Sequence, residues 1–183
     1  MPEAWKPTRA QIAAAHGKSI PDILAPNLLV LFCGINPSLY SAAVGHHFAR
    51  PGNRFWPAVH EAGFSARRLA PAEERELLAA GYGITNLVAR ATATADELTA
   101  DELLAGGRVL ARKVRRYRPR YVAFLGIGAY RTAFGRPAAS PGRQPEGLGG
   151  AGVWVLPNPS GLNAHYRLAD LARLYAELRR AAE

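Results

Sequence analysis

Two short polar segments of this chain combine residue types that can hold a ligand or a water molecule. The first is Gly34–Ser38, with the sequence GINPS, and the second is Asn158–Leu162, with the sequence NPSGL. Apolar runs that predict buried strands, Leu28–Cys33 and Val153–Leu156, end just before them. Because ligands of open α/β sheets bind at the carboxyl ends of parallel strands, the two segments are expected to form two walls of one site.

The composition limits the class of protein. With 183 residues, of which 49% are hydrophobic, the chain is long enough for one compact domain and short for two. The formal net charge of +9 favours a polyanionic partner. We favour nucleic acid over an anionic membrane because the chain has no basic amphipathic anchor. The single cysteine, Cys33, excludes an internal disulfide, a thiolate zinc site and an iron–sulfur cluster.

The sequence gives no sign of a membrane or metal partner. No apolar run is long enough to span a bilayer, and Met1–Lys6 lacks the apolar core of a secretory signal. We therefore expect a cytoplasmic protein associated with the nucleoid. His46 and His47 have no further metal-ligand residue at a useful spacing, so we interpret both as loop residues that can contact a phosphate.

Apolar periodicity and helix caps place the two segments in an α/β domain. Because helices separate the strands, we expect a three-layer α/β/α fold with a central, mainly parallel, four-stranded sheet. Residues 1–20 are interpreted as an N-terminal arm, residues 21–183 as a single domain, and residues 135–150 as a flexible surface loop. The expected strands are 28–33, 83–88, 121–126 and 153–156, and the expected helices are 8–15, 53–62, 71–80, 99–114, 129–134 and 165–180.

Three motifs in this order carry a resemblance to a known family. They are Cys33–Pro37 (CGINP), Pro51–Trp56 (PGNRFW) and Leu156–Leu162 (LPNPSGL). Together they resemble the mismatch-specific uracil-DNA glycosylases, the bacterial branch of the thymine-DNA glycosylase family, from about Ile23 to the last helix. The resemblance implies a uracil-DNA glycosylase-like fold and a monofunctional enzyme. Such an enzyme flips deoxyuridine out of mismatched duplex DNA and hydrolyses the N-glycosidic bond. We expect a monomer that needs no metal or cofactor and binds double-stranded DNA containing G·U or related mismatches.

The resemblance implies that the side-chain oxygen of Asn36 holds the attacking water. An amide cannot remove a proton at neutral pH, so this role is orientation, and slow chemistry is expected. The alternative is that Asn36 only caps the following turn. Asp96 follows the second strand at the ligand-binding edge, where a carboxylate could activate water or stabilise a sugar cation. Its alternative role is capping or solvation ahead of the helix that begins at Thr99.

The resemblance also implies a set of residues that form the base pocket. Ser38 stands where faster, uracil-only relatives carry a bulky tyrosine, so thymine, ethenocytosine or other 5-substituted pyrimidines are expected to enter unless Tyr40 refills the space. Phe48 is expected to stack on the flipped base, with a core aromatic as the alternative. Asn158 replaces a histidine of the faster relatives, which again predicts slow chemistry. The expected pocket residues are Gly34, Ile35, Ser38, Ser41, Phe48, Asn86 and Asn158.

A further set of residues is expected to contact DNA. Leu162 is interpreted as a wedge that fills the hole left by the flipped nucleotide, beside Ser160, Gly161 and Asn163. Asn163 and Ala164 depart from the Ser-Arg pair of close relatives. The loss of that arginine puts the strength of DNA binding at these positions in doubt. Arg50 and Arg54 are expected to contact DNA as well.

Two other functions remain open from the sequence. One is a non-catalytic DNA-binding module that kept the fold, against which the intact Asn36 and NPSG segment argue. The other is a nucleotide-binding enzyme that uses Gly126-Ile127-Gly128, although this glycine pattern is incomplete for a dinucleotide loop.

Overall fold

The core of the protein is one twisted sheet between two layers of helices. The computed structural model describes residues 5–183, so the first four residues of the expected arm lie outside the described part. The sheet has five strands in the order β2-β1-β3-β5-β4. They are β1 (Val30–Gly34), β2 (Tyr82–Asn86), β3 (Tyr121–Leu125), β4 (Gly142–Arg143) and β5 (Gly152–Leu156).

The sheet is parallel except at one edge. β1 pairs in parallel with β2 and β3, and β3 pairs in parallel with β5. The two-residue strand β4 runs antiparallel to β5, so the prediction of four strands was wrong by one. β4 lies within residues 135–150, which we had interpreted as a flexible loop. Two residues between glycines and prolines carry no apolar alternation, so no strand pattern marked it.

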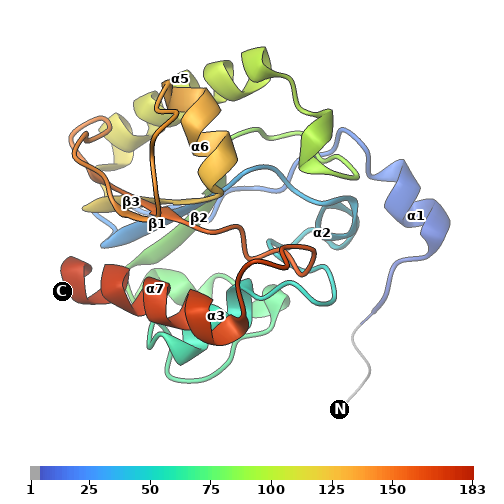
Figure 1. Ribbon diagram of the computed structural model, residues 1–183. Coiled ribbons are helices and arrows are strands. Elements are labelled where there is room, and N and C mark those ends of the chain that lie inside the picture. Colours follow the sequence, from blue (N-terminus) through green and yellow to red (C-terminus); the bar gives the residue numbers. More distant parts are fainter. Residues whose placement is uncertain (1–4) are drawn as a thin grey trace.

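Helices cover both faces of the sheet, as Figure 1 shows. On one face lie α5 (Ala100–Tyr117) and α6 (Ile127–Phe134), and on the other α3 (Phe55–Glu61) and α7 (Leu168–Ala182). The three-layer α/β/α expectation is therefore confirmed. α5 is the longest helix of the described part, and no helix there is long and apolar enough to cross a membrane.

Alternation along the strands divides the core in two. Val122 and Phe124 of β3 pack with α5 and α6, whereas Tyr121, Ala123 and Leu125 belong to the cluster with α3 and α7. This alternation is what a strand between two helix layers requires, because successive side chains point to opposite faces. Strands buried on both faces are typical of parallel sheets.

Several helix boundaries differ from the expected ones. α2 (Leu39–Val44) was not predicted, although Ser38 caps its first turn and Gly45 ends it with φ of 80°. The expected helix 71–80 is split into a 3-10 turn, Pro71–Glu73, and α4 (Glu76–Ala79). Six residues and four residues are short for a periodicity signal, which explains why α2 and α4 were hard to recognise.

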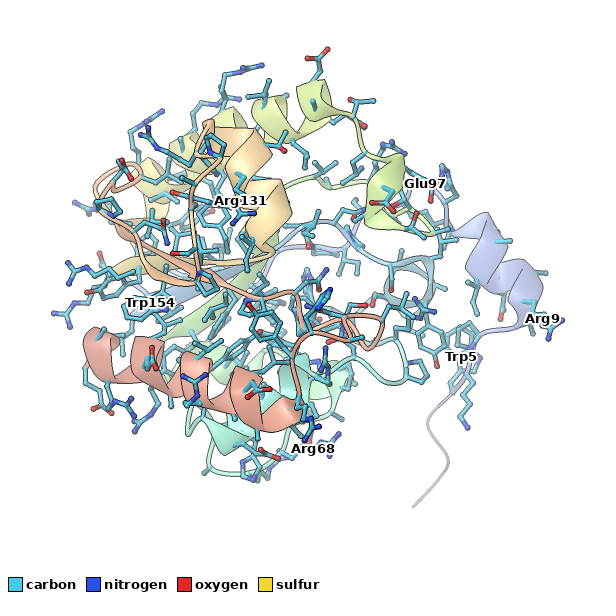
Figure 2. All side chains as sticks on the ribbon, in the orientation of Figure 1. Trp5, Arg9, Arg68, Glu97, Arg131 and Trp154 are labelled. Atoms are coloured by element: carbon cyan, nitrogen blue, oxygen red, sulfur yellow. The ribbon has the colours of Figure 1, made fainter. Side chains whose placement is uncertain are left out.

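The N-terminal arm packs on the domain through its described part. α1 (Arg9–Ala14) begins at Thr8, whose side chain accepts a hydrogen bond from the Gln11 amide, as expected for a short helix here. Ala15 and Ile20 are buried, and the backbone of Gly17 donates to the carbonyl of Ala91 at 2.9 Å. The arm therefore contacts the segment that follows β2. Figure 2 shows Glu97, at the end of that segment, on the side of the molecule where α1 lies.

Candidate active site

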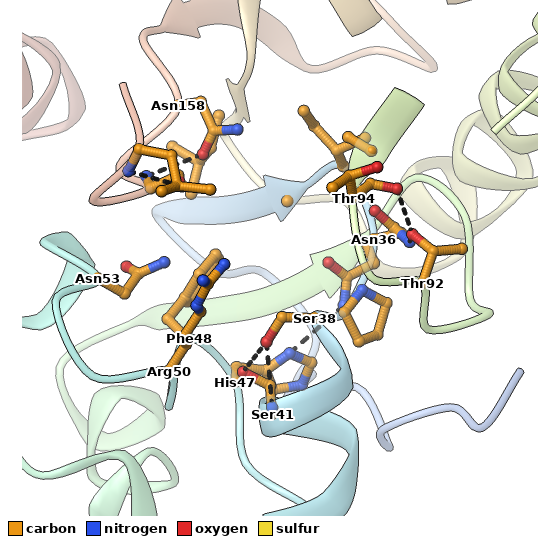
Figure 3. A pocket seen from close by; sticks show the side chains of 18 of the residues that line it. Asn36, Ser38, Ser41, His47, Phe48, Arg50, Asn53, Thr92, Thr94 and Asn158 are labelled. Carbon is orange, nitrogen blue, oxygen red and sulfur yellow. Dashed lines mark hydrogen bonds between the residues drawn. The ribbon is translucent and has the colours of Figure 1, made fainter. Parts of the chain in front are cut away.

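A cavity of about 400 Å³ opens at the carboxyl ends of β1, β2 and β5. Both polar segments line it, as shown from close by in Figure 3, so the structure brings them together as the sequence predicted. Gly161 and Arg54 are the two predicted site residues that do not line it. The predicted site residues that do are Gly34, Ile35, Asn36, Ser38, Ser41, Phe48, Arg50, Asn86, Asp96, Asn158, Ser160, Leu162 and Asn163.

The amide of Asn36 is held in one orientation. Its Nδ2 donates to the carbonyl oxygen of Arg90 at 2.9 Å and to Oγ1 of Thr92 at 2.8 Å. A backbone carbonyl only accepts hydrogen bonds, so the NH₂ group must face it. The Thr92 hydroxyl in turn donates to the carbonyl of Thr94 at 2.7 Å, which leaves its lone pairs for Asn36. Among the described residues nothing donates to the side-chain oxygen of Asn36, which therefore remains an acceptor for a ligand in a residue that lines the cavity.

The segment that anchors Asn36 is itself fixed by an ion pair. Arg90 donates through Nε and a terminal nitrogen to the carboxylate of Glu102, at 2.5 and 3.1 Å. The hydrogen bond from Arg90, with a second from the Thr99 amide, lowers the pKa of Glu102 to about 2. Glu102 therefore stays ionised at neutral pH and links the loop after β2 to the start of α5.

Thr92 is a site residue that sequence reasoning missed, since a lone threonine in a loop gives no signal.

Ser38 and Ser41 form a small hydrogen-bonded pair at the start of α2. Oγ of Ser38 donates to Oγ of Ser41 at 3.0 Å and accepts from the Ser41 amide at 3.1 Å. Oγ of Ser41 also accepts from the Ala49 amide at 3.0 Å, and Ser41 is buried. The hydroxyl of Ser41 thus holds the backbone after Phe48. Tyr40 is not among the residues that line the cavity, so it does not refill the space beside Ser38.

Phe48 lies between the core and the cavity. Its ring stacks on Phe55 with centroids 4.1 Å apart and an interplanar angle of 28°, while Phe48 itself lines the cavity and is only half-buried. The residue has φ of 54°, which is uncommon for a bulky side chain and is a strained conformation. Among the described residues, no hydrogen bond engages the backbone N–H groups of Phe48 or Ile35. These two groups are therefore available to a ligand.

The last residue of β2, Asn86, pairs with Gly34 of β1 and has its side-chain oxygen over that glycine. A Cβ built on Gly34 would lie 2.6 Å from Oδ1 of Asn86 and 3.3 Å from the ring of Phe48. Only glycine at position 34 leaves room for the amide, which explains why β1 ends in glycine. The buried His47 lies behind Asn86, with its Nδ1 3.4 Å from Nδ2 of Asn86. His47 is a loop residue as predicted, but its side chain is buried, so the prediction that it contacts a phosphate was wrong. No sequence pattern separated it from its half-buried neighbour His46.

The second segment forms the opposite wall and its rim. Oδ1 of Asn158 accepts from the Ser160 amide at 3.0 Å, so its NH₂ group is the part left for a ligand. Asn163 donates to the Asn158 carbonyl at 3.1 Å. Leu162 lines the cavity and is 72% exposed, so its apolar side chain meets solvent at the rim. Gly161 passes so close to the carbonyl of Gly52 that a Cβ would lie 2.6 Å from its oxygen, so this approach requires glycine.

Arg54 has a different position from the one expected of a DNA contact. Its guanidinium donates to three backbone carbonyls of the rim, those of Ser160 at 2.7 Å, Asn163 at 3.0 Å and Tyr166. Its own amide donates to the Pro159 carbonyl at 2.9 Å. Arg54 therefore ties the segment carrying Leu162 to the start of α3. Asn53, expected to cap that helix, accepts from the Phe55 amide at 2.9 Å and also lines the cavity.

Replacing Arg54 with lysine is expected to lower the free energy of unfolding by about 2 kcal/mol, because an ammonium group cannot reach all three carbonyls. Urea unfolding measures the change. Arg68→Lys is the matched control, since Arg68 is exposed and projects from the surface in Figure 2. Equal stabilities of the two variants would contradict a tethering role for Arg54.

Asp96 lies at the rim of the cavity. It belongs to a 3-10 turn, Ala95–Glu97, after the anchored Thr92 segment, and its side chain is exposed. Among the described residues that line the cavity, it carries the only carboxylate. The sequence placed Asp96 at this edge of the sheet, and the structure has it there.

The fold and the site together define a class of protein. A doubly covered parallel sheet with a polar cavity between two asparagine-bearing loops is an α/β/α ligand-binding domain. The family model described as the uracil DNA glycosylase superfamily matches residues 21–179, so the chain belongs to this superfamily. A solution NMR structure from Methanosarcina acetivorans, described as a putative uracil DNA glycosylase, has the same fold. It superposes with a TM-score of 0.61 and 19% identity, over 91% of this chain and 99% of that one.

Membership of the superfamily supports hydrolytic DNA glycosylase activity and binding to DNA. It also disfavours the nucleotide-binding alternative. The packing around Gly126 argues against that alternative as well. A Cβ on Gly126 would lie 2.8 Å from the Ile35 side chain. Gly126 therefore allows close packing between the end of β3 and the Gly34–Ser38 segment.

Proposed function

We propose that this protein is a monofunctional glycosylase that removes uracil from mismatched duplex DNA and leaves an abasic site for base excision repair. The observation that carries the proposal is the fixed amide of Asn36, whose NH₂ group is held at 2.9 and 2.8 Å and whose oxygen is left for a water molecule. A group that is already oriented loses no free energy to reorganisation when the reaction begins.

In the proposed reaction the bond between C1′ and the base nitrogen breaks as the sugar develops oxocarbenium character. The electron pair goes to the base, which leaves as an anion, and the water oxygen bonds to C1′ and releases a proton to solvent. Asn36 orients this water. The NH₂ group of Asn158 and the backbone N–H groups of Ile35 and Phe48 donate to the base as its negative charge grows.

The pocket is proposed to accept pyrimidines larger than uracil. The position facing C5 carries the small residue Ser38, whose hydroxyl is engaged with Ser41 at 3.0 Å. Since Tyr40 does not line the cavity, we do not expect it to exclude a 5-methyl substituent there. Stacking on Phe48 contributes about 1–3 kcal/mol for any base, because every base has a π-face.

Binding to DNA is proposed to use the rim of the cavity. Leu162, 72% exposed, inserts where the nucleotide has left, and the exposed Arg50 contacts a phosphate beside it. The net charge of +9 adds a salt-dependent, sequence-independent attraction. We propose that the protein acts as a monomer on nucleoid DNA in the cytoplasm.

The proposed substrate range is tested with labelled duplexes that differ in one pair. Single-turnover rates are measured on G·U, A·U, G·T and G·ethenocytosine, and on single-stranded uracil DNA. We expect release of uracil opposite guanine to be fastest, with slower release of the larger bases. Uracil release that is equal opposite adenine and guanine would contradict mismatch preference, and no release of any 5-substituted base would contradict the role given to Ser38.

Asp96 is proposed to act as the second catalytic group, because its carboxylate can stabilise the sugar cation that Asn36 cannot neutralise. Asp96→Asn is expected to lower the single-turnover rate on G·U about tenfold to a hundredfold. This loss is at or below the low end of the effects that general acid–base groups usually have. The matched control is Asp101→Asn, an exposed aspartate in the first turn of α5. If the two variants have the same rate, Asp96 only solvates the turn before α5.

A further inference from the structure

A buried histidine in the wall of the pocket has all of its described contacts inside the protein. His47 is 2% exposed, and its ring Nε2 lies 2.9 Å from the carbonyl oxygen of Pro21. Its backbone N–H donates to Glu74 at 2.8 Å, and its carbonyl accepts from Trp56 Nε1 at 3.0 Å. These contacts hold the backbone of His47 on both sides and the ring at Nε2, and the other ring nitrogen, Nδ1, faces the pocket residue Asn86.

The contact with Pro21 determines which ring nitrogen carries hydrogen. A carbonyl oxygen only accepts, so Nε2 of His47 is the donor, and in the neutral ring Nδ1 is then an acceptor. Nδ1 lies 3.4 Å from Nδ2 of Asn86, which has hydrogens to donate. The NH₂ group of Asn86 is therefore turned toward His47. Its oxygen lies on the opposite side, over Gly34 and beside the ring of Phe48.

We propose that His47 is a positioning residue that holds the oxygen of Asn86 toward the base and so sets the preference for uracil over cytosine. The inference rests on the proposed function, because it requires a pyrimidine in this cavity. Uracil carries a hydrogen on N3, which the oxygen of Asn86 can accept. Cytosine has a bare N3 lone pair, which this oxygen repels, whereas a reversed amide would donate to it. The discrimination therefore depends on what keeps the amide from reversing.

Two substitutions separate positioning from packing. In His47→Gln the side-chain NH₂ can take the place of Nε2 and keep the Pro21 contact, but the acceptor at Nδ1 is lost. In His47→Asn the side-chain oxygen takes the place of Nδ1 and keeps the acceptor toward Asn86, while the Pro21 contact is lost. Each variant removes one of the two ring contacts, so thermal unfolding of both shows whether either is simply misfolded.

The first readout is the ratio of uracil to cytosine release. Both bases are placed opposite the same abasic analogue, so that pairing does not differ between them. We expect His47→Gln to lower this ratio about tenfold, the effect of one lost buried hydrogen bond, and His47→Asn to retain it within about threefold. An unchanged ratio in His47→Gln, or an equal loss in both variants, would overturn the positioning role.

The second readout needs no catalysis. In ¹⁵N-labelled protein, long-range ring couplings report the tautomer of His47, and the side-chain NH₂ signals of Asn86 are assigned by their loss in Asn86→Ala. We expect hydrogen on Nε2, and a shift of the Asn86 signals in His47→Gln that is much smaller in His47→Asn. Hydrogen on Nδ1 of His47, or Asn86 signals that move in neither variant, would overturn the contact. Because this readout is independent of turnover, a protein that released no uracil would refute the proposed function without deciding the contact.

Discussion

Replacing Asn36 with alanine is expected to lower the single-turnover rate of uracil release at least about a hundredfold, because the water loses the group that aligns it with C1′. Binding to the same duplex, measured by fluorescence anisotropy, should change little, since Asn36 lies inside the cavity and the proposed DNA contacts lie at its rim. The change should therefore affect the maximal rate and leave the affinity for DNA nearly unaltered.

A graded variant makes this prediction sharper. Thr92→Val removes the acceptor at 2.8 Å but leaves the carbonyl of Arg90 to hold the amide of Asn36. The oxygen is then still present but less well fixed, so we expect an intermediate loss of about tenfold. If Asn36→Ala stays within threefold of the wild type, the water is oriented elsewhere and Asp96 is the next candidate.

Leu162→Ala is expected to lower uracil release from duplex DNA about tenfold to a hundredfold at limiting protein. The wedge offsets part of the cost of unstacking, which is about a few kcal/mol per base step. Single-stranded uracil DNA leaves no hole to fill, so there the variant and the wild type should have similar rates. Thermal stability should not change, because Leu162 is 72% exposed and contributes little to the core.

The control for this variant is Val109→Ala. Val109 is 47% exposed on α5, outside the cavity, and its removal also shortens an exposed apolar side chain. We expect wild-type rates on both substrates. A loss in Leu162→Ala that is as large on single strands as on duplexes would show that Leu162 contacts the base or sugar and does not act as a wedge.

The sequence predicted the layers of the fold and the meeting of the two loops because both depend on local pattern. Apolar runs at β1 and β5 followed by Asn-Pro turns determine where parallel strands end, and parallel strands end at the same edge. Both loops line one cavity because of this geometry. β4 escaped detection because it is two residues long and its pairing depends on β5 alone.

The orientation of side chains could not be predicted in the same way. The roles of Thr92, His47 and Arg54 depend on partners far away along the chain. The ring of His47 contacts Pro21 and Asn86, at sequence separations of 26 and 39 residues, and the guanidinium of Arg54 contacts carbonyls more than 100 residues away. A basic residue near a DNA-binding motif looks the same in the sequence whether it faces a phosphate or a backbone carbonyl.

The central claim is that the fixed amide of Asn36 belongs to a hydrolytic uracil site. The most direct measurement is a single-turnover reaction of the wild type and Asn36→Ala with a labelled duplex that carries one G·U pair, scored for alkali-labile abasic sites. We expect strand breaks at the uracil after alkali for the wild type, and at most about one hundredth of that rate for the variant. Tight binding of this duplex by the wild type without any abasic product would contradict the account and identify a non-catalytic DNA-binding module.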